Sequence, residues 1–339
     1  MMKWIEDRPF WRRFLLFGLP LVMFLLSFVV GRYPIPLSTV FRIILSKFVS
    51  IDHDWPKTVE AVVLQIRMPR IIGAFLVGSG LAVSGASFQG IFRNPLVSPY
   101  ILGVASGAAF GASLGILFSF GTVMLHVAAL LSGLLAVVLT FAVGRARSNA
   151  PPLVLVLSGV VVGSFFSALI SIIKYVADPF EKLPTIIFWL MGSLARVTPE
   201  IIAVAAPLMG LSMLALGTMR WRMNVLSLGE EEALALGIDT KKERGLVIFL
   251  CTVLTASAVC LSGIIGWVGL VIPHLARMMV GPDFRKLFPA CLSLGAFYVL
   301  GIDNLARTLS QGEIPLGILT ALIGAPFFAW LLTKTKVGW

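Results

Sequence analysis

The chain has 339 residues, of which 58% are hydrophobic and 13% charged, and its mean hydropathy is +0.98. Soluble globular domains use about 25% charged residues, so this composition excludes an ordinary soluble domain and predicts a protein that lies in lipid. The formal net charge of +11 is scattered between apolar runs and forms no stripe or reading motif. We therefore expect no nucleic-acid partner.

Ten apolar stretches are long enough, or nearly so, to cross a bilayer, which takes about 20 helical residues. The turn-like sequence SFGT at 119–122 divides the long uncharged run 94–144 into two of them. The candidate spans are residues 14–30, 71–92, 96–117, 122–144, 151–173, 201–219, 246–264, 267–280, 287–302 and 315–333. We predict an all-α polytopic membrane protein in which residues 1–339 form a single transmembrane domain.

Lysine and arginine residues set the expected orientation of these spans. With a cytoplasmic N-terminus, more of them fall on the cytoplasmic side than on the outer side, as the positive-inside rule requires. Both termini are therefore expected in the cytoplasm, and the protein in the cell (inner or cytoplasmic) membrane. The basic start resembles a signal peptide, but GRYP follows Val30 without a small-residue cleavage site, so we expect the first helix to be retained.

A dense polar segment, SLGEEEALALGIDTKKERG at residues 227–245, follows the sixth span on the expected cytoplasmic side. Three consecutive acids suit a helix N-terminus, and a glycine suits its end. Leucines give the same short helix an apolar surface. Both an ordinary polar loop and a docking surface for a soluble partner fit this pattern. The residues concerned are Glu230, Glu231, Glu232, Gly237, Leu228, Leu234 and Leu236.

Motifs for catalysis by the chain itself are missing from the sequence. There is no GK dipeptide, and hence no Walker A phosphate loop, and no HExxH zinc motif. Cys251, Cys260 and Cys291 lie in apolar spans without CxxC spacing, which is typical of small packing residues. We predict no enzymatic activity, no cofactor and no metal site.

The spans also contain almost no ionisable residue that could couple transport to an ion gradient. Asp178, Glu181, Asp303 and Glu313 all lie near predicted outer ends. This favours a permease driven by a separate ATPase. An ion-coupled secondary transporter is the alternative, and a receptor or scaffold without transport ranks third.

A weak internal repeat supports transport. Four residues recur at one offset of 178 positions, and the two copies would have opposite topology, as inverted repeats in transporters do. The pairs are Ser84 with Ser262, Gly85 with Gly263, Pro95 with Pro273, and Gly103 with Gly281.

Glycines recur at every fourth position in the third span, at Gly103, Gly107, Gly111 and Gly115. A smooth stripe of this kind predicts close helix packing, with substrate contact as the weaker alternative.

Five stretches resemble the FecCD-type permeases of type II ABC importers, in order and over nearly the whole chain. They are QIRMPR at 65–70, SGASFQGIFRNPLVSPYILGVASGA at 84–108, LGEEEALALGI at 228–238, GWVGLVIPHLAR at 266–277 and EIPLGILTALIGAPFF at 313–328. That family takes up ferric siderophores, haem, cobalamin and, in some members, oxyanions.

The resemblance implies a cobalamin-permease-like fold and a set of partners. It implies a homodimer of ten-helix subunits in membrane lipid, with a translocation path along the dimer axis. Two cytoplasmic ABC ATPase subunits and a periplasmic or surface-tethered substrate-binding protein complete the importer. The expected cargo is a ferric siderophore, with cobalamin or haem as alternatives.

Site residues follow by matching motif. The family's ATPase-coupling helix matches Leu228, Gly229, Glu230, Ala233, Leu236 and Gly237, and the charge and apolar patterns add Glu231 and Leu234. The family's arginines that dock the binding protein match Arg67, Arg70 and Arg307. From the residues alone, these arginines would equally fit snorkelling anchors near helix ends.

Two further matches concern the pathway. SNAPPL at 148–153 matches a cytoplasmic gate, with Asn149, Pro151, Pro152 and Leu153 as its residues, although the cobalamin permease has small hydroxyl residues at this point. FWLMGSL at 188–194 looks like the family's short outer helix. Trp189, Met191 and Gly192 are expected at the outer mouth, or Trp189 as an interfacial anchor.

Overall fold

The computed structural model describes residues 14–31, 33–51, 54–145, 152–310 and 312–334, and within these ranges the chain consists of helices and turns. The first half contains η1 (Phe14–Gly18), α3 (Leu19–Val29), α4 (Leu37–Leu45), α5 (Lys57–Ala61), η2 (Val62–Arg67), α6 (Met68–Ile91), α7 (Val104–Leu117), α8 (Thr122–Arg145) and α9 (Pro152–Val176). The second half contains α10 (Lys182–Leu190), α11 (Pro199–Thr218), α12 (Arg220–Leu228), α13 (Glu230–Ala235), α14 (Thr240–Ser262), α15 (Val268–Val280), α16 (Phe284–Leu309) and α17 (Leu316–Lys334).

Six helices among the described residues are long and apolar enough to cross a membrane, and four shorter apolar helices accompany them. The long ones include a continuous helix from Lys57 to Ile91, made of α5, η2 and α6. The shorter ones are Phe14–Val29, Val104–Leu117, Val268–Val280 and Leu316–Leu331. The prediction of an all-α polytopic membrane fold is confirmed.

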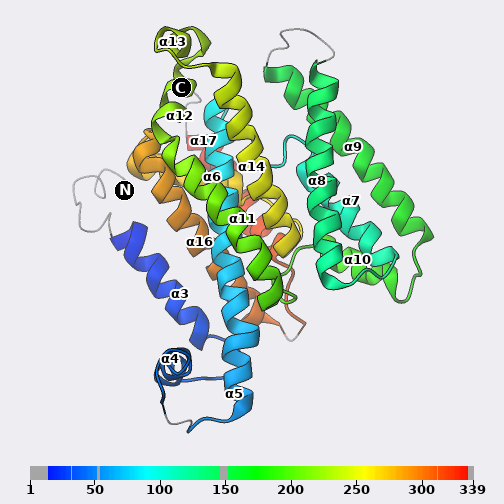
Figure 1. Cartoon of the computed structure of the whole chain (residues 1–339), viewed down its shortest axis with the longest axis vertical. Helices are drawn as coiled ribbons and strands as arrows, with labels where there is room; N and C mark the ends of the chain where they lie inside the picture. Colours follow the sequence, from blue (N-terminus) through cyan, green and yellow to red (C-terminus); the bar gives the residue numbers. More distant parts are fainter. Residues whose placement is uncertain (1–13, 32, 52–53, 146–151, 311, 335–339) are drawn as a thin grey trace.

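Two helices form the centre of the bundle. α6 packs against α14, α15 and α16, and α14 contacts α6 and α11 as well as α7 and α8. Figure 1 shows α7, α8, α9 and α10 as a group on one side of α14, with α13 at one end of the molecule and α4 and α5 at the opposite end. α14 therefore joins the two groups of helices and runs from the α13 end toward the opposite end.

Close crossings at the centre depend on glycine. A Cβ atom at Gly85 of α6 would lie 1.9 Å from the carbonyl oxygen of Gly269 in α15, and one at Gly78 would lie 2.1 Å from that of Gly295 in α16. Such distances are far below van der Waals contact, so only glycine lets these backbones approach.

Four predicted spans differ clearly from the helices in the structure, and the first of them, 71–92, belongs to a helix that already begins at Lys57. The stretch 96–117 becomes helical only at Val104, because Pro95 and Pro99 lack N–H groups and Gly103 has a left-handed φ of +77°. α14 starts at Thr240 rather than 246, after Asp239 caps it by accepting the Lys242 N–H at 3.1 Å. α16 extends well beyond the predicted 287–302 at both ends.

One repeated pair of glycines, Gly103 and Gly281, has a positive φ in both copies. Gly103 stands directly before α7 and Gly281 shortly before α16, and their φ values are +77° and +83°. The other repeated positions differ, since Ser84 and Gly85 lie inside α6 whereas Ser262 ends α14.

Candidate functional site

The polar segment 227–245 contains a short helix, α13, as the sequence predicts. Gly237 ends it with a φ of +77°, while the Ile238 N–H reaches the Ala233 carbonyl at 3.0 Å and the Gly237 N–H reaches that of Leu234 at 2.9 Å. This hydrogen-bond pattern is the usual glycine stop of a helix. Gly229 separates α13 from α12.

Three leucines and three glutamates of this segment are exposed, and we call them the α13 surface. Leu228, Leu234 and Leu236 are 55%, 57% and 54% exposed, and Glu230, Glu231 and Glu232 lie beside them in the chain. A solvated connection has no use for three exposed leucines so close together, whereas a docking surface does.

The other side of α13 is fixed to the bundle. Ala233 is fully buried and Ile238 is 8% exposed. Arg244 of α14 lies 3.5 Å from the Glu230 carboxylate, and Arg222 of α12 pairs with Glu243 of α14 at 2.7 Å. A force on the α13 surface would therefore act on α12 and α14 as well.

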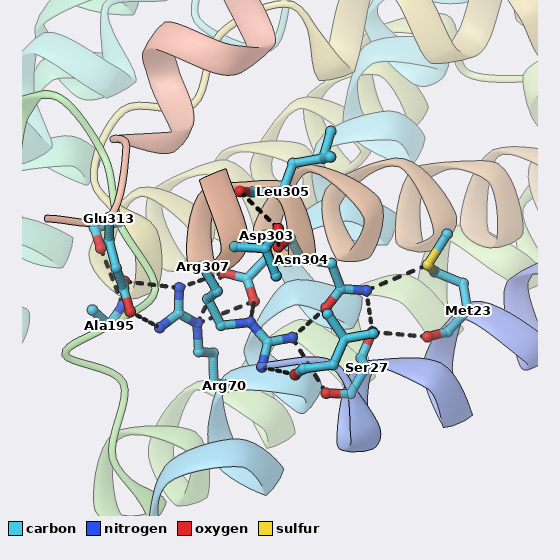
Figure 2. Close-up of polar contacts among 12 residues, drawn as sticks. Met23, Ser27, Arg70, Ala195, Asp303, Asn304, Leu305, Arg307 and Glu313 are labelled. Atoms are coloured by element: carbon cyan, nitrogen blue, oxygen red, sulfur yellow. Dashed lines mark hydrogen bonds and ion pairs between the residues drawn. The ribbon is translucent and has the colours of Figure 1, made fainter. Parts of the chain in front are cut away.

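A buried charged cluster lies in another part of the molecule, where α6, α16 and the turn before α17 meet (Figure 2). Arg70 Nε lies 2.9 Å from Asp303 Oδ1, and its Nη2 lies 2.9 Å from the same oxygen. Arg70 also reaches Glu313, with Nη1 3.1 Å from Oε1 and Nη2 3.0 Å from Oε2. Arg307 Nε completes the cluster 3.2 Å from Asp303 Oδ2. Two cations and two anions thus balance each other, with Arg70, Arg307 and Asp303 buried and Glu313 partly exposed.

Arg307 and Arg67 also hold the end of the first helix. Arg307 donates to the carbonyl oxygens of Val30 at 3.2 Å and Ser27 at 3.3 Å, and to the side chain of Asn304. Arg67 donates to the carbonyl oxygens of Phe28 and Tyr33. These bonds satisfy carbonyl groups that the end of α3 leaves without helical partners.

The three arginines predicted for docking are therefore not free surface groups. Arg67, Arg70 and Arg307 are only 4%, 5% and 6% exposed, and each is bonded within the chain. The expectation of exposed or snorkelling arginines is wrong for this structure, because carboxylates and carbonyl groups surround them. The sequence showed Asp303 and Glu313 only as isolated acids; their signal was that they are charged residues near span ends in a charge-poor chain.

A cavity of about 560 Å³ lies beside this cluster, with Glu313 in its lining. Residues from the start of α8, α10, the turn 193–198, the end of α14 and the turn 312–315 line it. Its walls include Phe120, Phe188 and Trp189, and its charged residues include Arg196. The volume is in the range of small-molecule sites.

The predicted outer-mouth residues form a junction next to this cavity. Trp189 of α10 lines the cavity. Met191 and Gly192 accept hydrogen bonds at their carbonyl groups from Gly317 and Leu316 at the start of α17, at 3.0 and 2.9 Å. Gly192 has a φ of +79°, so a residue with a side chain would strain this turn.

The predicted gate lies mostly outside the described residues. Asn149 and Pro151 fall in the range 146–151, and α9 begins at Pro152, with Leu153 following.

The glycine stripe packs against α8 in its middle part. A Cβ atom at Gly107 would lie 2.5 Å from Ala136 Cβ, and one at Gly111 would lie 2.3 Å from the Ala128 carbonyl oxygen. Gly115 has more room, at 3.3 Å, and Gly103 stands before the helix. The contacts favour the predicted packing role at Gly107 and Gly111.

Among the described residues, no three His, Cys, Asp or Glu side chains are grouped so that they could hold a metal ion. Cys251, Cys260 and Cys291 are buried thiols.

Comparison with known proteins relates these features to a family. Residues 19–334 match the model of the FecCD transport family. The molybdate import system permease protein MolB of Haemophilus influenzae is 44% identical, over 96% of each chain. The hemin transport system permease protein HmuU of Yersinia pestis is 38% identical, over 80% of this chain and 83% of its own. A solved inward-facing structure of a metal-chelate type ABC transporter superposes with a TM-score of 0.83 at 43% identity, covering 94% of this chain and 97% of that one.

Proposed function

Because this chain belongs to the FecCD transport family, we propose that it is the permease subunit of an ATP-binding-cassette importer. The chain contributes the path, and a separate partner subunit hydrolyses ATP. The observation that carries this proposal is the α13 surface, in which three leucines more than half exposed lie in and directly beside a short helix anchored to the bundle. Such a surface is suited to a soluble ATPase.

The proposed assembly is a homodimer with two ATPase subunits below it. In this proposal the protein lies in the inner membrane of the cell, and α13 and both chain termini face the cytoplasm. Closing of the ATPase pair would push α13, and α14 would carry the motion, because α14 begins next to α13 and ends in the lining of the cavity. This is a rigid-body form of alternating access.

The end opposite α13 is proposed to receive a periplasmic or surface-tethered binding protein. In this proposal Trp189, Met191 and Gly192 lie at the outer mouth of the translocation path. Residues 149–153 form its gate on the cytoplasmic side. Docking at Arg67, Arg70 and Arg307 is part of the proposal, with one condition from the structure. Carboxylates of the binding protein would have to replace the internal partners of these arginines. Of the two carboxylates among these partners, Glu313 is the more exposed, at 31% against 1% for Asp303.

The proposed cargo is a metal in an anionic or chelated form. The relatives named for molybdate and hemin, and the metal-chelate transporter, support this class. Ferric siderophore, which the family resemblance implies as the expected cargo, is one member of it, and cobalamin is a further candidate.

The test is uptake by proteoliposomes that contain the permease, its ATPase and its binding protein. Labelled molybdate, ferric siderophore, hemin and cobalamin are offered separately, with and without ATP. We expect one of them to accumulate only when ATP and the ATPase are present. Accumulation without the ATPase, abolished by an ionophore, would show a secondary transporter instead.

A further inference from the structure

The cavity beside the charged cluster has a wall of aromatic side chains and one cation without a partner. Arg196 lies in the turn between α10 and α11 and is exposed. Within the described part of the chain, no hydrogen bond or ion pair is formed by its side chain. A cation placed between low-dielectric walls acts more strongly on a ligand than one on an open surface.

The carboxylates near the cavity do not cancel this charge. Glu313 also lines the cavity, but Arg70 already balances it through two contacts of 3.1 and 3.0 Å. Glu200 lines an adjoining apolar groove between α8 and α11 and is not in the lining of the cavity. Of the charged side chains in the described lining, Arg196 is therefore the one whose charge no neighbour balances.

A hydrogen-bond donor stands close to Arg196. The Ser193 hydroxyl oxygen accepts the Ala195 N–H at 3.1 Å, so its own hydrogen remains available to a ligand. Ser193 and Arg196 both line the cavity. A guanidinium and a hydroxyl donor on one wall fit the oxygen atoms of an anion.

We propose that this cavity is an entry site for anionic cargo, in which Arg196 pairs with the negative charge and the aromatic side chains contact the rest of the ligand. This inference rests on the proposed function, because it names the charge class of the cargo. It applies to a metal oxyanion and to an anionic metal chelate alike. An uncharged cargo would gain nothing from Arg196.

The charge of the cavity can be measured without transport. Ala195→Cys places a thiol beside Arg196, in the full-length permease in lipid nanodiscs with Cys260→Ala as background. The rates at which a positively and a negatively charged methanethiosulfonate reagent label this thiol are then compared. Each labelling rate is divided by the rate at which the same reagent reacts with a free thiol in solution. We expect the anionic reagent to be favoured by about tenfold or more, with Arg196→Gln removing this preference and Arg196→Lys keeping it.

A matched control is Lys57→Gln, which removes an exposed cation that does not line the cavity. It should leave the preference unchanged, and all variants should have the melting temperature of the parent. Equal rates for the two reagents, or a preference that Arg196→Gln leaves intact, would overturn the proposal.

The class of anion is resolved by protection from the same labelling. Molybdate, ferric citrate and cyanocobalamin are added in turn. Slower labelling with molybdate alone indicates an oxyanion site, with ferric citrate alone a chelate site, and with both a general anion site. Protection by cyanocobalamin only, or by none of the three, contradicts the proposal. Because no ATPase or binding protein is used, a failure here is distinct from a failure of ATP-driven uptake.

Discussion

Arg70 and Asp303 lie 233 positions apart in the sequence, yet the arginine Nε stands 2.9 Å from the carboxylate Oδ1, and both side chains are almost fully buried. One comes from α6 and the other from α16, which packs closely against α6. Removing one member of such a pair leaves an uncompensated buried charge, which typically costs about 3–5 kcal/mol.

Asp303→Asn should therefore lower the free energy of unfolding by about 3 kcal/mol or more, measured as loss of helical signal on heating in nanodiscs. Glu313→Gln is the matched control. Its carboxylate is 31% exposed, so the loss should be clearly smaller. A single Asp303→Asn variant as stable as the parent would show that the pair does not matter.

Gly111→Ala should disturb the packing of α7 against α8. The added Cβ would lie 2.3 Å from the Ala128 carbonyl oxygen, and overpacking of this kind costs about 1–3 kcal/mol. Gly210→Ala in α11 is the control, because nothing lies within 4 Å of its Cβ position. It should stabilise the helix slightly, by about 0.5–1 kcal/mol. Equal melting temperatures for the two variants would remove the packing role of the stripe.

Acid sensitivity should depend in part on Asp283. This residue caps α16 by accepting the Arg285 N–H at 2.9 Å and the Asn224 amide at 2.7 Å, and these bonds lower the pKa of its carboxyl group. A lowered folded-state pKa stabilises the protein above the ordinary value of about 3.9 and ceases to do so as the pH falls through the folded value.

Asp283→Asn can still cap the helix but does not titrate. Its melting temperature should fall less between pH 5 and 3 than that of the parent, although both have similar values near pH 7. Parallel pH profiles would show that this carboxylate contributes nothing to acid unfolding.

The α13 surface should bind the ATPase through its leucines. Replacing Leu228, Leu234 and Leu236 with serine should weaken binding of the purified ATPase to nanodisc-held permease by about tenfold or more, since buried anchors at interfaces are each worth about 1–2 kcal/mol. Leu246→Ser in α14, also an exposed leucine at 45%, should bind normally. Unchanged affinity in the triple variant would argue that the ATPase docks elsewhere.

Helix number and type follow from composition because lipid demands long uncharged helices. Helix boundaries are harder to predict where prolines, glycines and capping residues determine them. Val104 starts α7 late because Pro95, Pro99 and Gly103 precede it, and the charged turn from Thr240 is helical because Asp239 caps it. A count of uncharged runs ends a span at each charge, so it stopped before Asp303, which is buried in mid-helix beside Arg70.

The short helix α13 can be predicted because its signals are local: acids at its start, a leucine within it and two others beside it, and a glycine after its end. The charged cluster and the cavity cannot be predicted in this way, because both depend on contacts between segments that are distant in the sequence. Nothing in the sequence around Arg70 indicates that Asp303 and Glu313 will neutralise its charge. Arg196 is likewise one basic residue among many until the cavity around it is seen.

The central claim is that this permease moves only when a partner hydrolyses ATP. The most direct measurement is the initial rate of cargo uptake into proteoliposomes that hold the permease with its binding protein and either the active ATPase or a variant that binds ATP without hydrolysing it. We predict uptake with the active ATPase and none above background with the inactive one. Equal uptake in both preparations would contradict the account.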